Sequence, residues 1–248
     1  MEKHLWRGCP VIEKRFRVAY VSYDGFDETE RTVFPSMLEE TERIERYIKE
    51  EYGGKVCAVY GCSLGGSFVG LLAARGNIRM DYGILGSSDL DQAGKAAARL
   101  QTALVMKIMY PLLRDGGFRS GFMRKIYDRQ IAKMGDHGRK ITRMFGIGAK
   151  GLPFVSKESV RNQFYSDLVT PLPDHIKAGG TEIHILYALK MGEKYRARYQ
   201  RHFESPVLHE LDPRHEELLA CYPEEWAEQI AAVCLQTKRP VSVRKADR

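Results

Sequence analysis

The chain has 248 residues, 44% of them hydrophobic, and this length allows one large domain or a core domain with a second one inserted into it. No apolar run reaches the roughly 18 residues that span a bilayer, and the N-terminal segment MEKHLWRGCPVIEKRF lacks the apolar stretch of a secretory signal. The sequence therefore predicts a cytoplasmic protein without an integral membrane segment.

The cysteines are odd in number and show no paired spacing of the kind that binds metals. A disulfide framework or a zinc site is therefore not expected, and reduced thiols are the simplest interpretation. We expect neither a metal nor an organic cofactor. The five cysteines are Cys9, Cys57, Cys62, Cys221 and Cys234.

The net charge of +7 is unevenly distributed, because residues 92–166 contain 15 Lys and Arg against 4 Asp and Glu. These charges alternate with apolar residues at helical intervals, as on the solvated faces of amphipathic helices. Attraction of an anionic substrate or a lipid surface is the alternative interpretation. Nucleic-acid binding is not expected, since the segment has no recognisable binding motif or stacking platform.

The first half of the chain alternates between predicted strands and helices. VAYVS at 18–22 is a short β-branched run that ends at Asp-Gly, which predicts a buried strand. A helix is predicted over 35–51, a strand over 55–60, a helix rich in small residues after GCSLGG, and a strand over 81–85. Strands that alternate with helices indicate a parallel sheet covered on both faces.

Strand patterns disappear from about residue 92 to 173, where helical segments are broken by Gly and Pro. Strands are predicted again at 182–189 and 206–211, and a final helix at 224–235. We therefore predict an α/β fold, with a mostly parallel sheet flanked by helices. Residues 1–91 and 174–248 would form its core, and 92–173 an inserted helical cap.

The sequence Gly61-Cys62-Ser63-Leu64-Gly65 lies directly between a predicted strand and a predicted helix. A serine at such a tight turn has its hydroxyl raised above the sheet edge, and the close approach of backbone requires glycine at flanking positions. The first free N–H of the new helix, that of Leu64, lies where an oxyanion would develop. Ser63 is therefore the candidate nucleophile.

From the strand that ends in SYDGFD, through YGCSLGG and the helical insertion, to a late His before a Pro-Glu-Glu helix start, the chain resembles the α/β-hydrolase superfamily. This resemblance implies a catalytic triad in the order Ser, acid, His, with the His after the last strand. His215 matches that position and would act as general base. His209 and His184 lie inside predicted strands and are less suitable.

The triad acid usually follows the penultimate strand in this family, and the first acidic residue there is Glu193, which we predict to orient His215. Asp89 matches an alternative acid position of some relatives, and Asp167 and Asp174 border the end of the insertion. Each of these carboxylates has the simpler interpretation of a helix cap or a solvated group.

The resemblance has one gap. Family members have earlier strands, and one of these, at the middle of the sheet, ends in a loop that donates a second N–H to the oxyanion. The slot for this strand lies between the segments at 18–22 and 55–60. We expect that the chain is an N-terminally shortened version of the family, that its sheet is rearranged, or that a partner chain supplies the strand.

The leading functional prediction is a serine hydrolase that acts on a small ester or related acyl substrate through an acyl-enzyme at Ser63. Apolar residues of the insertion, among them Leu104, Ile108 and Phe122, would pack its core or roof an acyl pocket. The alternative is a hydrolase-like protein that binds a small molecule with weak or no turnover.

Overall fold

The computed structural model describes residues 10–118, 120–144, 151–212 and 217–235. Within these ranges, four strands form one parallel sheet in the order β1-β2-β3-β4. Chain order and sheet order are therefore the same, and the carboxyl ends of all four strands meet at one edge. The strands are β1 (Lys55–Cys62), β2 (Arg79–Gly86), β3 (Glu182–Ala188) and β4 (Val207–Leu211).

The helices that cover and extend the sheet begin and end at residues typical of helix termini. The side chain of Ser36 accepts a hydrogen bond from the N–H of Glu39 and caps α2, which ends at Gly53 in the left-handed conformation. In chain order the helices are α1 (Pro10–Glu13), α2 (Met37–Tyr52), α3 (Leu64–Arg75), α4 (Lys95–Asp115), α5 (Gly121–Lys133), α6 (Gly135–Met144), α7 (Lys157–Val169), the 3₁₀ helix η1 (Leu189–Met191), α8 (Glu193–His202), α9 (Glu217–Cys221) and α10 (Pro223–Cys234).

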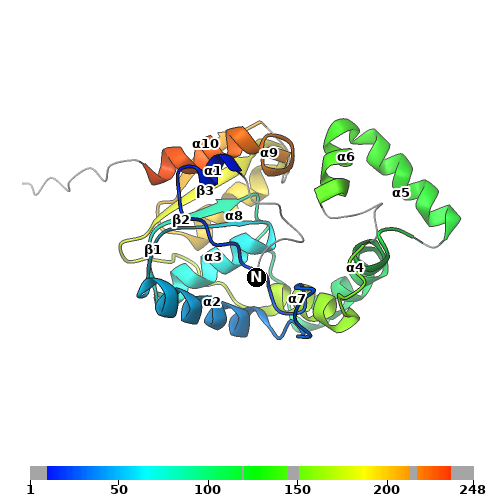
Figure 1. Ribbon diagram of the computed structural model, residues 1–248, viewed down its shortest axis with the longest axis horizontal. Coiled ribbons are helices and arrows are strands. Elements are labelled where there is room, and N and C mark those ends of the chain that lie inside the picture. The colour runs from blue at the N-terminus through cyan, green and yellow to red at the C-terminus, as the bar shows by residue number, and fades with distance from the viewer. Residues whose placement is uncertain (1–9, 119, 145–150, 213–216, 236–248) are drawn as a thin grey trace, which may run out of the picture.

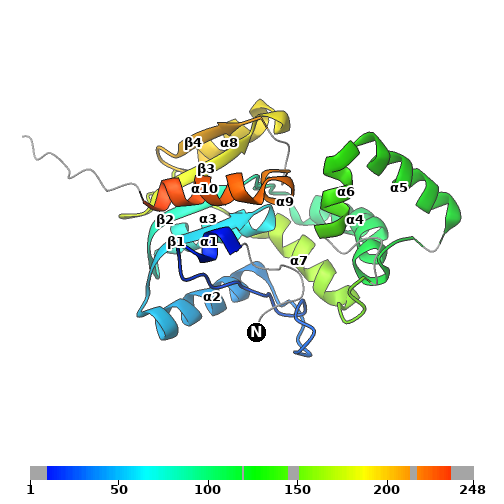
Figure 2. The same ribbon diagram turned by 45° about the horizontal axis from the view of Figure 1, so that its top comes forward.

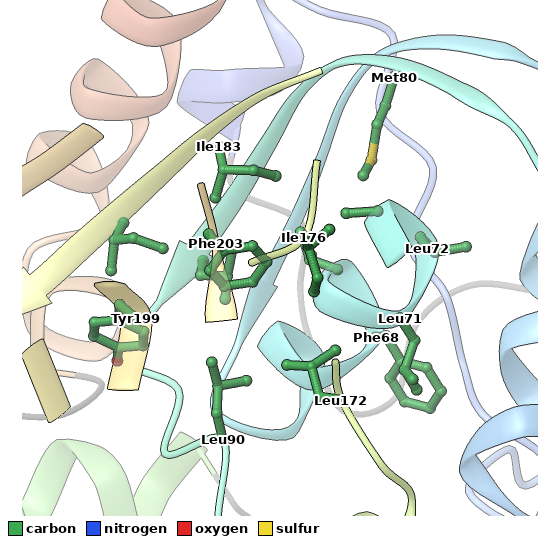
Figure 3. Close-up of a cluster of buried hydrophobic side chains, with 14 of the residues drawn as sticks. Phe68, Leu71, Leu72, Met80, Leu90, Leu172, Ile176, Ile183, Tyr199 and Phe203 are labelled. Carbon is green, nitrogen blue, oxygen red and sulfur yellow. The ribbon is translucent and has the colours of Figure 1, made fainter. Parts of the chain in front are cut away.

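Helices lie on both faces of the sheet, and its two central strands, β2 and β3, are almost wholly buried apolar runs. The edge strands β1 and β4 are mostly only partly buried. Figure 1 shows α1 and α10 on one side of the sheet and α2 and α3 on the other. On the second side, side chains of α3 and α8 and of the sheet form the largest apolar cluster. Figure 3 shows part of it, with Phe68, Leu72, Ile183, Tyr199 and Phe203 among the labelled residues.

The helices α4 to α7 lie between β2 and β3 in the chain, where the sequence predicted a helical insertion. Met106 and Leu113 of α4 pack against Val155 and Val160, so α4 and α7 share a small apolar cluster of their own. Figures 1 and 2 show α5 and α6 at the end of the molecule away from the sheet. The division of the chain into a core and a cap domain stays a prediction.

The expected strand at 18–22 is wrong, because these residues have no regular secondary structure. A strand is stable only when a neighbour satisfies its backbone N–H and C=O groups, and the structure pairs no described segment with this one. Val18 packs on the apolar cluster beneath α10, whereas Val21 is 50% exposed. The sheet thus has β1 at its edge in the described part of the chain.

No helix within the described ranges combines the length and the apolar character needed to cross a bilayer.

Candidate active site

Ser63 occupies the turn between the end of β1 and the start of α3, called the elbow below, in a backbone conformation that non-glycine residues rarely adopt. Its φ is 53° and its ψ is −120°. Such strain persists only where the surrounding structure enforces it. Here the Ser63 N–H donates to the carbonyl oxygen of Gly86 at 3.0 Å, and the Ser63 carbonyl accepts from Gly66 N–H at 2.9 Å. The turn is therefore held on both sides, by β2 and by α3.

Two of the three neighbouring glycines are required by the packing of this turn. A Cβ on Gly61 would lie 2.0 Å from the carbonyl oxygen of Gly65, and a Cβ on Gly66 would lie 2.4 Å from the Cβ of Ser88. Both distances are far inside van der Waals contact. Gly65 is not required in this way, because the atom nearest to a Cβ at this position would be the Tyr23 hydroxyl oxygen, at an ordinary distance of 3.8 Å. Only Gly61 and Gly66 are sterically obligatory.

The start of α3 offers a donor to a developing oxyanion. Leu64 is the first residue of α3, so its N–H has no acceptor within the helix. The Ser63 side chain does not cap this helix either. Both the hydroxyl of Ser63 and the N–H of Leu64 thus remain outside the helix hydrogen-bond pattern.

The loop at 24–26 does not supply a second backbone donor, because its N–H groups are used internally. Asp24 N–H donates to Glu40 Oε1 at 3.3 Å, and Gly25 N–H donates to Thr32 Oγ1 at 2.8 Å. Phe26 N–H donates to the Tyr23 carbonyl oxygen at 3.0 Å. The second oxyanion donor that the family resemblance implies is therefore not this loop.

Tyr23 brings a hydroxyl next to the first turn of α3, a feature for which the sequence carries no signal. Its ring packs against Phe68 of α3, with ring centroids 4.8 Å apart. Burial, and secondarily the nearby carboxyl groups of Glu40 and Asp167, raise the pKa of Tyr23 above its usual value. The phenol is therefore protonated at neutral pH and is able to donate a hydrogen bond.

Glu40 is a buried carboxyl group under the same loop. Its side chain is 3% exposed, and Oε2 has no hydrogen-bond partner. Burial raises the pKa of Glu40 from its usual 4.5 to about 7. This group therefore changes its ionisation near neutral pH, unlike an exposed glutamate.

Asp167 on α7 forms a hydrogen bond with Ser67, which lies one helical turn after Ser63 on α3. Burial, together with the carboxylates of Asp89 and Asp91, raises the pKa of Asp167 to about 6, although the Ser67 contact lowers it. This contact joins the last helix of the insertion to the helix that begins at the candidate nucleophile.

The loop after β2 is held next to the elbow by two consecutive residues of α8. Tyr199 donates a hydrogen bond of 2.5 Å to the carbonyl oxygen of Ser88. Arg198 donates one of 2.6 Å to the carbonyl oxygen of Asp89 and forms an ion pair with Asp91. The polar sequence of α8 predicted no such role, because which residues of a helix reach a distant loop depends on tertiary packing.

The predicted triad residues belong to segments that leave the sheet at the same edge. Ser63 follows β1 and Glu193 follows β3 as the first residue of α8. The Glu193 side chain is 79% exposed and pairs with Arg196 at 3.7 Å. His215 lies outside the described residues, in the segment that follows β4. The assignments of His215 and Glu193 therefore stay predictions.

The alternative acids differ in their surroundings. Asp89 follows β2, and its carbonyl oxygen is fixed by Arg198. Asp174 is engaged elsewhere, since its carboxylate lies 3.1 Å from His202 Nδ1 and 3.2 Å from Arg201. Asp167 is bonded to Ser67, as described above. These contacts make Asp174 the least available of the three.

Two other histidines form a pair within the sheet. His184 on β3 and His209 on β4 are stacked, and His184 Nδ1 lies 2.8 Å from His209 Nε2. Burial lowers the pKa of both residues. His209 is thus a packing residue of the sheet, as its predicted place inside a strand suggests.

A cavity of about 10 Å³ lies beside the elbow and has Cys62, Ser87 and Trp226 among its lining residues. A second, also of about 10 Å³, is lined by residues of α3, of α7 and of the loop after β2, among them Ser67, Asp167 and Leu90. Each has room for about one water molecule.

Neither a protein-family model nor a curated protein sequence matches the chain. Solved structures do match it. An alpha/beta hydrolase family protein from Desulfitobacterium hafniense superposes with a TM-score of 0.62 at 16% identity, over 86% of this chain and 82% of that one. A hydrolase from Pseudomonas aeruginosa PA01 has a TM-score of 0.61 at 13% identity, over 92% and 83% of the two chains. A thermophilic esterase from Thermogutta terrifontis has a TM-score of 0.57 at 17% identity, over 85% and 76%.

Proposed function

We propose that this chain, which has the α/β-hydrolase fold, is a serine hydrolase that acts on a small ester or related acyl substrate. The observation that carries the proposal is the strained conformation of Ser63 between β1 and α3, with a φ of 53°. The superposed structures include proteins described as a hydrolase and an esterase, which supports a hydrolytic reaction.

In the proposed reaction, Ser63 Oγ attacks the acyl carbonyl while His215 takes the hydroxyl proton. The Leu64 N–H stabilises the oxyanion, and His215 returns the proton to the leaving alcohol. His215 then deprotonates a water molecule, which attacks the acyl-enzyme carbonyl. The bond to Ser63 Oγ breaks, His215 gives its proton to Ser63 Oγ, and the acid is released. Glu193 would orient His215 and stabilise its protonated form. Asp89 and Asp167 are the alternatives for this role, and Asp174 is the least available one.

A fluorophosphonate probe tests the nucleophile directly, because it reacts only with an activated serine. We expect labelling at Ser63, located by peptide mass spectrometry, and turnover of p-nitrophenyl butyrate. Ser63→Ala should lose both, while the control Ser120→Ala, at the start of α5, should keep both. Turnover at the parent rate in Ser63→Ala would exclude the proposal.

A second candidate function is a hydrolase-like protein that binds a small molecule with weak or no turnover. It is favoured by the internal use of the N–H groups of Asp24, Gly25 and Phe26, which leaves the N–H of Leu64 as the backbone donor identified at the elbow. Failure of the parent chain to react with the probe, combined with a ligand that raises its melting temperature, would support this function.

A further inference from the structure

Helix α4 has two apolar faces, although a helix at a protein surface needs only one. Its inner face is buried and includes Met106 and Leu113. Its outer face carries three apolar side chains four residues apart, Leu100, Leu104 and Ile108, which are 64%, 55% and 48% exposed. Residues at this spacing lie along one side of a helix. The second stripe is therefore apolar surface that faces solvent.

Helix α5 also has apolar side chains that are exposed to solvent. None of its residues is buried, and Phe122, Met123 and Ile126 are 72%, 37% and 42% exposed. Two bulky apolar residues four positions apart, Phe122 and Ile126, thus share one outward side of the helix. Figures 1 and 2 both show α5 at the extreme end of the molecule, where a flat surface could reach it.

Positive charge surrounds these apolar side chains. Arg129 and Lys133 follow Ile126 by three and seven residues and lie on the same side of α5, and both are exposed. On α4, the exposed Lys107 follows Leu104 by three residues. Residues 95–144 as a whole contain 12 Lys and Arg against 3 Asp and Glu.

We propose that the outer faces of α4 and α5 form a docking surface for an anionic lipid bilayer. Helices with Phe and Leu among Lys and Arg lie in the plane of a membrane, with the apolar side chains at the headgroup boundary and the cations beside lipid phosphates. The positive charge of this surface makes a second copy of the chain a poorer occupant than an anionic bilayer, because a contact between two copies would bring two basic surfaces together. This surface goes beyond the proposed hydrolase function and does not depend on the activity of Ser63.

Co-sedimentation of the full chain with vesicles tests this surface. We compare vesicles of phosphatidylcholine with vesicles in which about 30% of the lipid is phosphatidylglycerol, the anionic component. Binding to the anionic vesicles should be at least about tenfold stronger, and it should weaken when NaCl rises from about 0.1 M to about 0.5 M.

Paired variants separate the apolar from the electrostatic contribution. Phe122→Ser with Ile126→Ser, and Arg129→Gln with Lys133→Gln, should each weaken binding to anionic vesicles about tenfold. Matched controls lie outside this surface. Leu38→Ser removes an exposed apolar side chain from α2, and Arg46→Gln with Lys49→Gln removes two exposed charges from the same helix. All variants change exposed residues, so unchanged melting curves are expected.

Equal binding to both kinds of vesicle would overturn the proposal, as would controls that lose as much binding as the α5 variants. Analytical ultracentrifugation tests whether a second copy of the chain occupies this face instead. A dimer of the parent chain that Phe122→Ser with Ile126→Ser dissociates, without any vesicle binding, would show that this face joins two copies of the chain and is not a lipid site.

Discussion

The hydroxyl of Tyr199 donates a hydrogen bond of 2.5 Å to the carbonyl oxygen of Ser88, across 111 residues of sequence. Ser88 is almost fully buried, and its Cβ lies where a side chain on Gly66 would have to be. The bond therefore fixes the loop after β2 against the first turn of α3. That turn begins at Ser63. Helix α8 therefore helps to hold the candidate active site in place, although Glu193 is the one residue of this helix with a proposed catalytic role.

Replacement of Tyr199 by Phe keeps the buried ring but removes this donor. The Ser88 carbonyl oxygen would remain buried without its partner, so the free energy of unfolding should fall by about 1–3 kcal/mol. Urea denaturation measures the change. Tyr195→Phe, on the same helix, is the control and should stay within about 0.5 kcal/mol of the parent chain. Equal losses in both variants would contradict the importance of the Ser88 contact.

The glycines of the elbow give a matched pair of substitutions. In Gly61→Ala the new methyl group would meet the Gly65 carbonyl oxygen at 2.0 Å, so the turn must shift. We expect a loss of about 3 kcal/mol or more in the free energy of unfolding and loss of probe labelling at Ser63. Gly65→Ala should be neutral or stabilising by about 0.5–1 kcal/mol, because alanine favours the helix and has room. A stable, reactive Gly61→Ala variant would show that the turn is looser than described.

Glu40 should make the stability of the chain depend on pH. Its pKa is about 7 in the folded state against an ordinary 4.5, so the folded chain binds the proton more tightly than the unfolded chain. Its contribution is therefore fully present below about pH 4.5 and is lost as pH rises through about 7. Glu40→Gln removes this loss, and it should raise the free energy of unfolding by about 1–3 kcal/mol at pH 8.

The effect of Glu40→Gln should shrink towards zero at pH 5, which thermal melting at both pH values measures. Glu50→Gln changes an exposed residue of the same helix and should show no such pH dependence. A Glu40→Gln variant that gains the same stability at pH 5 as at pH 8 would mean that the substitution acts through packing and not through ionisation.

The two histidines near the end of the chain should respond differently to substitution. His215→Ala should lower turnover of p-nitrophenyl butyrate by several orders of magnitude, because an unassisted serine hydroxyl is a poor nucleophile at neutral pH. His209→Ala should mainly reduce stability, since His209 stacks on His184 within the sheet. If His209→Ala lowered kcat by orders of magnitude and His215→Ala did not, the assignment of His215 as the general base would be wrong.

The features that the sequence determined by itself are local ones. The turn at Ser63 could be predicted because its glycines, the β-branched strand before it and the small-residue helix after it are consecutive in the chain. Apolar runs of five to eight residues likewise indicated the four strands found in the described part of the chain, since the apolar, β-branched composition of a strand is a local feature of the sequence.

The segment at 18–22 shows the limit of this approach. Its apolar, β-branched residues resemble those of the true strands, but a strand exists only when a neighbour completes its hydrogen bonds. The same holds for α4, whose sequence shows apolar residues on two sides. Only the packing of α4 on α7 decided which stripe is buried and which one is exposed.

The polar surroundings of the elbow were decided by tertiary structure alone. Glu40, Asp167 and Tyr199 come from three helices that are far apart in the chain. The sequence marked only Asp167, as an alternative acid, and it did not predict the contact of Asp167 with Ser67. Their pKa values and hydrogen bonds depend on desolvation and on partners that only the folded chain brings within a few ångströms. The local sequence thus determined the turn that holds Ser63, whereas the packing of distant helices determined which polar groups surround this turn.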